Sequence, residues 1–230
     1  MTDQRIGDRI RVPITRSTLV PEVRDAIESL IMDGVIPPGT RVGMEALARE
    51  LGTSPTPIRE ALASLESAGL VVKESLKGYS TTPLMTRAEV EDMFRFRLLI
   101  EPWAAETAAR ADPEQTAPLT TEVASALAAA GDGEANYRDI ARHDARFHDM
   151  ITELAGSDHV RQALARTHCH LHLFRLSYGP VMAAPTFAEH RRIAESIAEG
   201  RPDLAKAAMV DHLTTARDRI LKSMSSDPRT

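Results

Sequence analysis

Apolar positions in the first third of the chain follow a helical period in three segments. Within 19–33, 44–51 and 54–69, apolar side chains recur every three or four residues, as they do on the buried face of an amphipathic helix. A short turn with a glycine joins the second segment to the third, and Ser54 followed by Pro55 suits an N-cap and a first helical position. This order predicts a helix-turn-helix.

Beyond these helices the pattern changes to that of short strands. Residues 71–73 and 79–81 predict two strands, and 74–78 predicts the tip between them. We therefore expect a winged helix-turn-helix of three helices plus a small β-hairpin wing over residues 18–83, with the capped third helix as its recognition helix. The arginine-containing stretch 1–17 predicts a flexible N-terminal arm.

The rest of the chain has a helical period throughout. Glycines and prolines divide it into six predicted helices. Six helices in under 150 residues predict an all-α antiparallel bundle over 84–224, followed by a flexible tail at 225–230, so the expected fold class is mostly α. The predicted helices span 86–111, 115–130, 134–155, 158–178, 186–199 and 202–223.

Charge and cysteine content limit the protein classes further. The formal net charge is −5, and residues 1–83 carry 10 basic against 11 acidic side chains, so binding to nucleic acid requires that the charges be separated by face. The single cysteine excludes an internal disulfide, which fits a reducing compartment. With no secretory signal and no long apolar run, we expect a cytoplasmic protein without a membrane span.

Four polar residues interrupt the apolar faces of the predicted bundle helices. Asp144 and His148 lie four positions apart in one helix, His190 falls within the apolar stripe of another, and His212 is in line with alanines in the last. A buried carboxylate is costly unless it is paired or bound to a metal. Each histidine alone would fit a hydrogen-bonded core position, but the four together predict a site for a divalent cation, zinc first, with nickel or manganese as alternatives.

The sequence His168-Cys169-His170-Leu171-His172 invites interpretation as a second metal motif. Because the segment is predicted to be helical, only His168 and His172 share a face, and they could line the same cavity as the first four residues. We favour partly buried helix histidines over a second metal site, and a small core residue over a reactive thiol for the cysteine.

Three stretches, DGVIPPGTRV, LARELGTS and PIREALASLESAGLV, resemble the GntR-type bacterial transcription regulators over about 19–83. The resemblance implies that the recognition helix enters the major groove of DNA. This chain has Pro55 and Glu45 where that family usually has arginine, which leaves the operator sequence open and makes Arg59 the main candidate for base reading, with Arg49 on phosphate. The implied DNA contacts on the helix and near the wing are Ser54, Thr56, Arg59, Lys73, Lys77 and Gly78.

Four later stretches, FRFRLLIEPWAAETAA, DARFHDMI, EHRRIAESI and MVDHL, resemble the ligand-binding domain of the FadR-type branch of the same regulators, over roughly 86–222. In members that contain metal, one aspartate and three histidines hold the ion, and they match Asp144, His148, His190 and His212. The resemblance further implies a small carboxylate effector at the open positions of the ion, with Arg97 facing the same cavity, and dimerisation through the helical domain.

These features together predict a transcription regulator that binds an operator in double-stranded DNA as a homodimer and responds to a small organic acid. Release of a repressed promoter is the expected outcome of effector binding. The alternative is a metal-dependent hydrolase that uses the Asp/His site, but the chain has no general-base motif such as His-Glu-x-x-His, so we expect no enzyme. A winged helix used only for protein contacts is a third interpretation.

Overall fold

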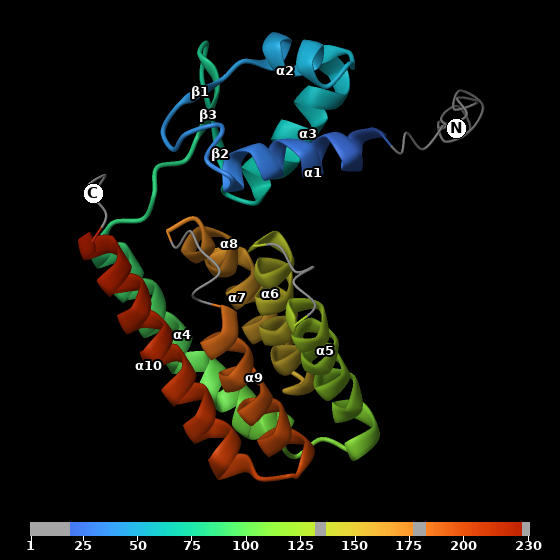
Figure 1. Ribbon diagram of the computed structural model, residues 1–230, viewed down its shortest axis with the longest axis vertical. Coiled ribbons are helices and arrows are strands. Elements are labelled where there is room, and N and C mark those ends of the chain that lie inside the picture. Colours follow the sequence, from blue (N-terminus) through green and yellow to red (C-terminus); the bar gives the residue numbers. More distant parts are fainter. Residues whose placement is uncertain (1–18, 132–136, 177–182, 227–230) are drawn as a thin grey trace, which may run out of the picture.

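The computed structural model describes residues 19–131, 137–176 and 183–226, and it forms two bodies joined by an extended segment (Figure 1). The smaller body holds the first three helices and all strands of the described residues, and the larger one is an elongated bundle of helices. The predicted N-terminal arm, 1–17, lies outside the described residues.

The smaller body is a winged helix-turn-helix, as the sequence predicted. Its strands form an antiparallel sheet in the order β1-β3-β2. Strand β1 was not predicted, because it has only two residues and owes its conformation to pairing with β3, where Arg41 faces Ser80 and Val42 faces Tyr79. The elements are α1 (Leu19–Met32), β1 (Arg41–Val42), α2 (Met44–Glu50), α3 (Pro55–Ser67), β2 (Val71–Glu74) and β3 (Gly78–Thr81).

The predicted stripe on the recognition helix forms the core of this body. Ile58, Leu62 and Leu65 of α3 are fully buried and pack with α1, whereas the opposite face of α3 is exposed. Gly69 ends the helix with φ +70, a left-handed conformation that glycine adopts without strain. The burial of one face therefore fixes which side of α3 is available to a partner.

The larger body is an antiparallel bundle whose long helices share one apolar core. Helix α10 lies along α4 and against α9, while α5 packs on both α6 and α9. None of the helices in the described ranges offers a stretch long and apolar enough to cross a bilayer. The helices are α4 (Arg87–Ala108), α5 (Pro113–Gly131), α6 (Tyr137–Leu154), α7 (Asp158–Thr167), α8 (Cys169–Phe174), α9 (Ala183–Ala198) and α10 (Pro202–Ser226).

Two predictions of helix boundaries need correction. The predicted single helix 158–178 is broken into α7 and α8 at His168, whose φ of 46° lies in the left-handed region and ends α7. The last helix extends to Ser226, so the first two residues of the predicted flexible tail 225–230 are helical, and 227–230 lie outside the described residues. The break turns α8 toward the smaller body, beneath α1 and α3 (Figure 1).

Candidate functional site

The structure brings together the four residues that the sequence selected as metal ligands. Asp144 and His148 come from neighbouring turns of α6, His190 from α9 and His212 from α10. All four are buried, and one potential ligand atom of each lies within 4.8 Å of those of the other three. This donor set, three imidazoles and one carboxylate, suits a divalent transition metal.

Two of the imidazoles are oriented by carboxylates from neighbouring helices. Nδ1 of His148 donates a hydrogen bond to Glu101 on α4, and Nδ1 of His212 donates to Oε2 of Glu189 at 2.8 Å. An imidazole that donates from Nδ1 keeps Nε2 free of a proton when neutral, which is the arrangement found behind metal-binding histidines. The sequence interpretation missed both glutamates.

His190 is oriented by another histidine. Its Nδ1 lies 3.1 Å from Nε2 of His143, whose Nδ1 in turn lies 3.2 Å from Oε1 of Glu122. The other nitrogen of His190, Nε2, is buried without a hydrogen-bond partner among the described residues and lies 3.5 Å from Oδ1 of Asp144. A buried polar atom without a partner is costly, and a cation between these atoms would satisfy it. The residues present therefore fit a bound metal.

Asp144 uses its two carboxylate oxygens differently. Oδ1 faces His190, while Oδ2 accepts a hydrogen bond of 2.6 Å from Nδ1 of His170 on α8. Burial alone would raise the pKa of Asp144, but the hydrogen bond and charge of His170, with smaller effects of His148 and His190, hold it well below its usual range. The carboxylate is therefore ionised and able to bind a cation.

Burial keeps His148 and His190 in the neutral form at physiological pH. Burial lowers the pKa of His148 to about 4, although the negative charge of Glu101 opposes the effect. Burial, together with the electrostatic effect of the neighbouring His212, lowers the pKa of His190 well below its usual value. Metals bind neutral imidazole, so no proton has to leave these two ligands at pH 7.

Arg97 lies beside the cluster, buried on α4. Its Nε donates to Oε1 of Glu101 at 2.5 Å, and its Nη2 lies 3.3 Å from Nε2 of His148. Burial would raise the pKa of Glu101, but the charges of Arg97 and His148 lower it overall, so the buried pair is ionised. The structure thus places the predicted effector residue next to a candidate metal ligand and also shows that it has a carboxylate partner.

The expected DNA contacts of the helices are accessible. Ser54, Thr56 and Arg59 are exposed at the start of α3, and Arg49 is exposed on α2. Ser54 occupies the N-cap position with no side-chain capping bond, and neither Arg49 nor Arg59 forms an ion pair with another described residue. These side chains are available to a partner.

The expected contacts at the wing are also at the surface. Lys73 on β2 is exposed, and its Nζ lies 5.9 Å from the centre of the Tyr79 ring. Lys77 at the tip is exposed and pairs with Glu74, and Gly78 begins β3 with φ +90, which only glycine adopts readily. Both lysines carry their charge on the outside of the sheet.

The histidines of the 168–172 segment are half-buried, as the favoured interpretation expected, but the helix breaks at the first of them. His168 borders a pocket of about 220 Å³ together with His170, whereas His172 lies so close to Gly69 of the other body that a Cβ there would be 3.0 Å from its Nε2. The alternative that His168 and His172 line one cavity does not hold, because the helix breaks at His168. His170, which the sequence interpretation set aside, is the one that contacts Asp144. Cys169 is a buried core residue, as expected.

Known proteins share both halves of the chain. Residues 92–215 match the FCD domain family and residues 4–80 the gntR family of bacterial regulatory proteins. The HTH-type transcriptional regulator YdhC of Bacillus subtilis is 29% identical over 81% of this chain and 84% of its own. A probable D-xylose utilization operon transcriptional repressor of Paenarthrobacter nicotinovorans is 26% identical over 87% of this chain and 88% of its own. The crystal structure of a putative GntR regulator from Rhodococcus sp. RHA1 has the same fold, with a TM-score of 0.68 and 18% sequence identity. The match covers 90% of this chain and 99% of that one.

These families and relatives are transcriptional regulators and not enzymes, which confirms the prediction that the chain is not a hydrolase. GntR regulators bind DNA operators and are typically dimeric. The order of the two matched regions is the order in which the sequence resemblances occur. The chain belongs to the GntR family of bacterial transcriptional regulators and carries an FCD domain after its winged helix-turn-helix.

Proposed function

We propose that this regulator is a homodimeric repressor whose operator affinity is controlled by a small carboxylate bound at a divalent metal site in the FCD domain. One observation carries the proposal: an ionised aspartate and three histidines converge in the core, and Nδ1 of each imidazole is hydrogen-bonded to a residue outside this set of four. A purely structural cluster has no need of three imidazoles that are each oriented by a hydrogen bond at Nδ1.

Four of the side chains suit a divalent cation, and the bound cation together with Arg97 suits the carboxylate of an acid. Asp144, His148, His190 and His212 would hold zinc, or nickel or manganese, and leave coordination positions open. The bound ion supplies a Lewis-acid position for one carboxylate oxygen of the effector. Arg97, buried 3.3 Å from His148, adds a fixed positive charge and further N–H donors for the remaining oxygens. Glu101 keeps that guanidinium in place.

The winged helix-turn-helix would read the operator from its exposed side. Arg59 is the candidate for base contacts in the major groove, supported by Ser54 and Thr56, while Arg49 would bind phosphate. At the wing, Lys73, Lys77 and Gly78 would lie along the backbone or the groove. A homodimer would place two such units on half-sites about one helical turn apart.

Control by the acid requires that it bind one arrangement of the dimer better than the other. Ordering of the helices around Asp144 and Arg97 would favour one placement of the two DNA-binding domains. In a repressor, the favoured placement no longer matches the half-site spacing, and the promoter is released. The size of the response is limited by the ratio of the acid's affinities for the two arrangements.

Metal and acid binding by the full-length protein test this function. Elemental analysis and calorimetric titration of metal-free protein should show one zinc ion per chain, and acids such as acetate, lactate or citrate should bind only to the zinc-loaded form. Arg97→Lys should weaken acid binding while zinc affinity stays unchanged, because the planar fork of donors is lost. Exposed His159 on α7 offers the control His159→Ala. Failure of zinc to bind, or equal binding of acids without it, would overturn the proposal.

A further inference from the structure

We infer that helix α8 transmits the state of the metal site to the DNA-binding domain, with His170 and Arg175 as the positioning residues at its two ends. The inference deepens the function proposed above and rests on it. It identifies the element through which ligand binding at Asp144 would reach the recognition helix.

At the metal side, α8 contacts two of the proposed ligands through His170. Nδ1 of His170 hydrogen-bonds to Oδ2 of Asp144 at 2.6 Å, and its ring stacks on that of His148 with centroids 4.8 Å apart. The two contacts involve both metal-binding residues of α6. A change in the position of the Asp144 carboxylate on binding a cation or an acid is therefore passed to His170.

At the other side, α8 is attached to the linker between the two bodies. The guanidinium of Arg175, directly after α8, is buried and donates to Thr82, from Nη1 to Oγ1 at 2.8 Å and from Nη2 to the carbonyl oxygen at 2.7 Å. The hydroxyl of Thr82 donates in turn to the carbonyl of Gly69 at 2.9 Å. Gly69 follows the recognition helix α3, so a chain of hydrogen bonds runs from α8 to the end of that helix.

Packing ties α8 to both bodies as well. Cys169 and Leu173 are buried in the core of the bundle, whereas Leu171 and Phe174 pack against the core of the winged helix-turn-helix. His172 lies over Gly69, where no side chain would fit without a shift. Neighbouring residues of one short helix thus belong to two different cores, so α8 cannot move without affecting both.

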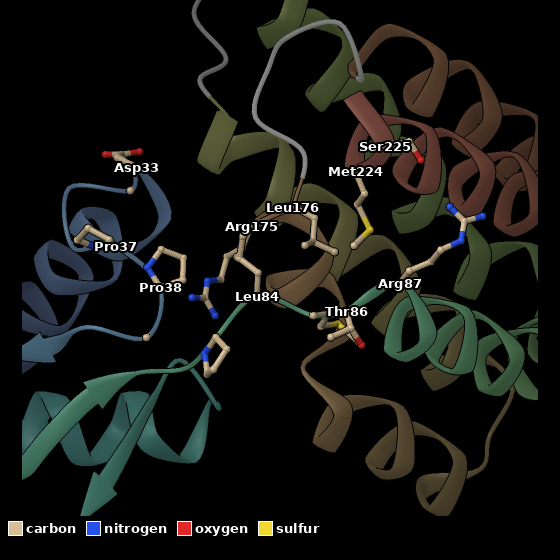
Figure 2. A pocket seen from close by; sticks show the side chains of 14 residues that line it. Asp33, Pro37, Pro38, Leu84, Thr86, Arg87, Arg175, Leu176, Met224 and Ser225 are labelled. Atoms are coloured by element: carbon tan, nitrogen blue, oxygen red, sulfur yellow. The ribbon is translucent and has the colours of Figure 1, made fainter. Parts of the chain in front are cut away.

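Helix α8 is distinct from the helix that precedes it, so it can shift without α7. The left-handed residue His168 separates it from α7. Next to Arg175, a pocket of about 980 Å³ lies between the 37–39 turn and the 83–87 linker (Figure 2). Figure 2 shows Arg175 extending across this space between Pro38 and Leu84. The pocket leaves this side of the linker open, so the hydrogen bonds from Arg175 to Thr82 join those from Thr82 to Gly69 and Leu70 in fixing its position.

Hydrogen exchange in the full-length, metal-free protein tests the link without any ligand. His170→Phe keeps a ring against His148 but removes the bond to Asp144, and we expect peptides covering 66–83 to exchange about fivefold faster. Arg175→Lys should do the same. The double variant should exchange no faster than Arg175→Lys alone, because both changes interrupt one path.

Two further variants make the result specific. Arg161→Lys disrupts the two hydrogen bonds of 2.7 Å to Asp149 within the bundle. Peptides covering 66–83 should then exchange hydrogen at the wild-type rate. Thr82→Val removes the hydroxyl that joins Arg175 to Gly69 and is a milder change. It replaces Arg175→Lys in the test of α8 if that variant does not fold. Wild-type exchange of 66–83 in His170→Phe, or fully additive effects in the double variant, would overturn the role of α8.

A zinc titration separates this inference from the function on which it rests. In wild-type protein, zinc binding should change exchange in 66–83, and the change should be lost in Thr82→Val while zinc affinity is kept. If zinc binds but hydrogen exchange in 66–83 stays the same, the role of α8 in transmission is overturned while the metal site stands. Absence of zinc binding would overturn the proposed function, and the metal-free variants alone would then decide on α8.

Discussion

Nδ1 of His212 on α10 lies 2.8 Å from Oε2 of Glu189 on α9, and the same carboxylate accepts two hydrogen bonds from Arg219. Burial would raise the pKa of Glu189, but the hydrogen bonds from His212 and Arg219 lower it to about 2. The carboxylate therefore stays charged and fixes the imidazole, so that its other nitrogen faces the cluster.

Removal of this charge should weaken metal binding while every direct ligand is kept. We expect Glu189→Gln to lower zinc affinity by about 10- to 100-fold, the usual cost of losing such a supporting group. Chelator competition measures the effect. Glu195→Gln is the matched control on the same helix, because Glu195 is exposed and, among the residues that the structure describes, its ion pair is with Arg191 at 3.8 Å. Equal affinities of the two variants would show that Glu189 does not orient the ligand.

The buried pair of Arg97 and Glu101 should be sensitive to the loss of one partner. Glu101→Leu leaves a buried guanidinium without its carboxylate and should cost about 3–5 kcal/mol in the free energy of unfolding. Adding Arg97→Met should recover much of that loss. Urea unfolding of the metal-free protein is the measurement, and Asp92→Ala, in an exposed pair with Arg95, should change stability by less than about 1 kcal/mol. Simple additivity of the two core changes would argue against this coupling.

Zinc affinity should depend only weakly on pH. An ordinary imidazole with a pKa near 6.5 is about 90% protonated at pH 5.5, so three such ligands would lose about a thousandfold in affinity relative to pH 7.5. The pKa of His148 is about 4 and that of His190 is also lowered, so neither binds a proton in this range. Titration at both pH values should therefore show a loss well under a hundredfold, and a thousandfold loss would contradict the burial of these imidazoles.

Operator affinities of two variants should distinguish residues that contact DNA bases from residues that contact the DNA backbone. We expect Arg59→Ala to cost about 1–3 kcal/mol and to relax the sequence preference, whereas Lys73→Ala should weaken all duplexes alike and reduce the salt slope by about 1. Fluorescence anisotropy at two salt concentrations distinguishes the two. Arg24→Ala, on α1 and paired with Glu28 at 2.8 Å, is the control in the same domain. An unchanged preference in Arg59→Ala would remove this residue from base reading.

The convergence of the candidate metal ligands was predictable because each residue carries a local signal. Asp144 and His148 share a face through their four-residue spacing, and His190 and His212 stand out as polar residues on apolar faces. The residues behind them were missed because their partners come from other helices. Glu101 alone carried a usable signal, since it lies four positions after Arg97 and so could pair with it along α4.

The break at His168 had no comparable signal. A histidine in the left-handed conformation is uncommon, and the helical period continues on both sides of it. The bend depends on contacts of α8 with Asp144 and with the smaller body, which join residues far apart in the chain. The short strand β1 was missed for the same reason, because its two residues are extended only through their partners on β3.

The affinity of the full-length protein for its own operator, measured with and without zinc and added acids, tests the central claim most directly. The operator is first selected from a random duplex pool with zinc-loaded protein. We expect a two-fold symmetric site, and at least one small carboxylate should change its affinity by about tenfold or more in the wild type but not in His148→Ala. Failure to enrich any site, or one affinity under all metal and acid conditions, would contradict the account.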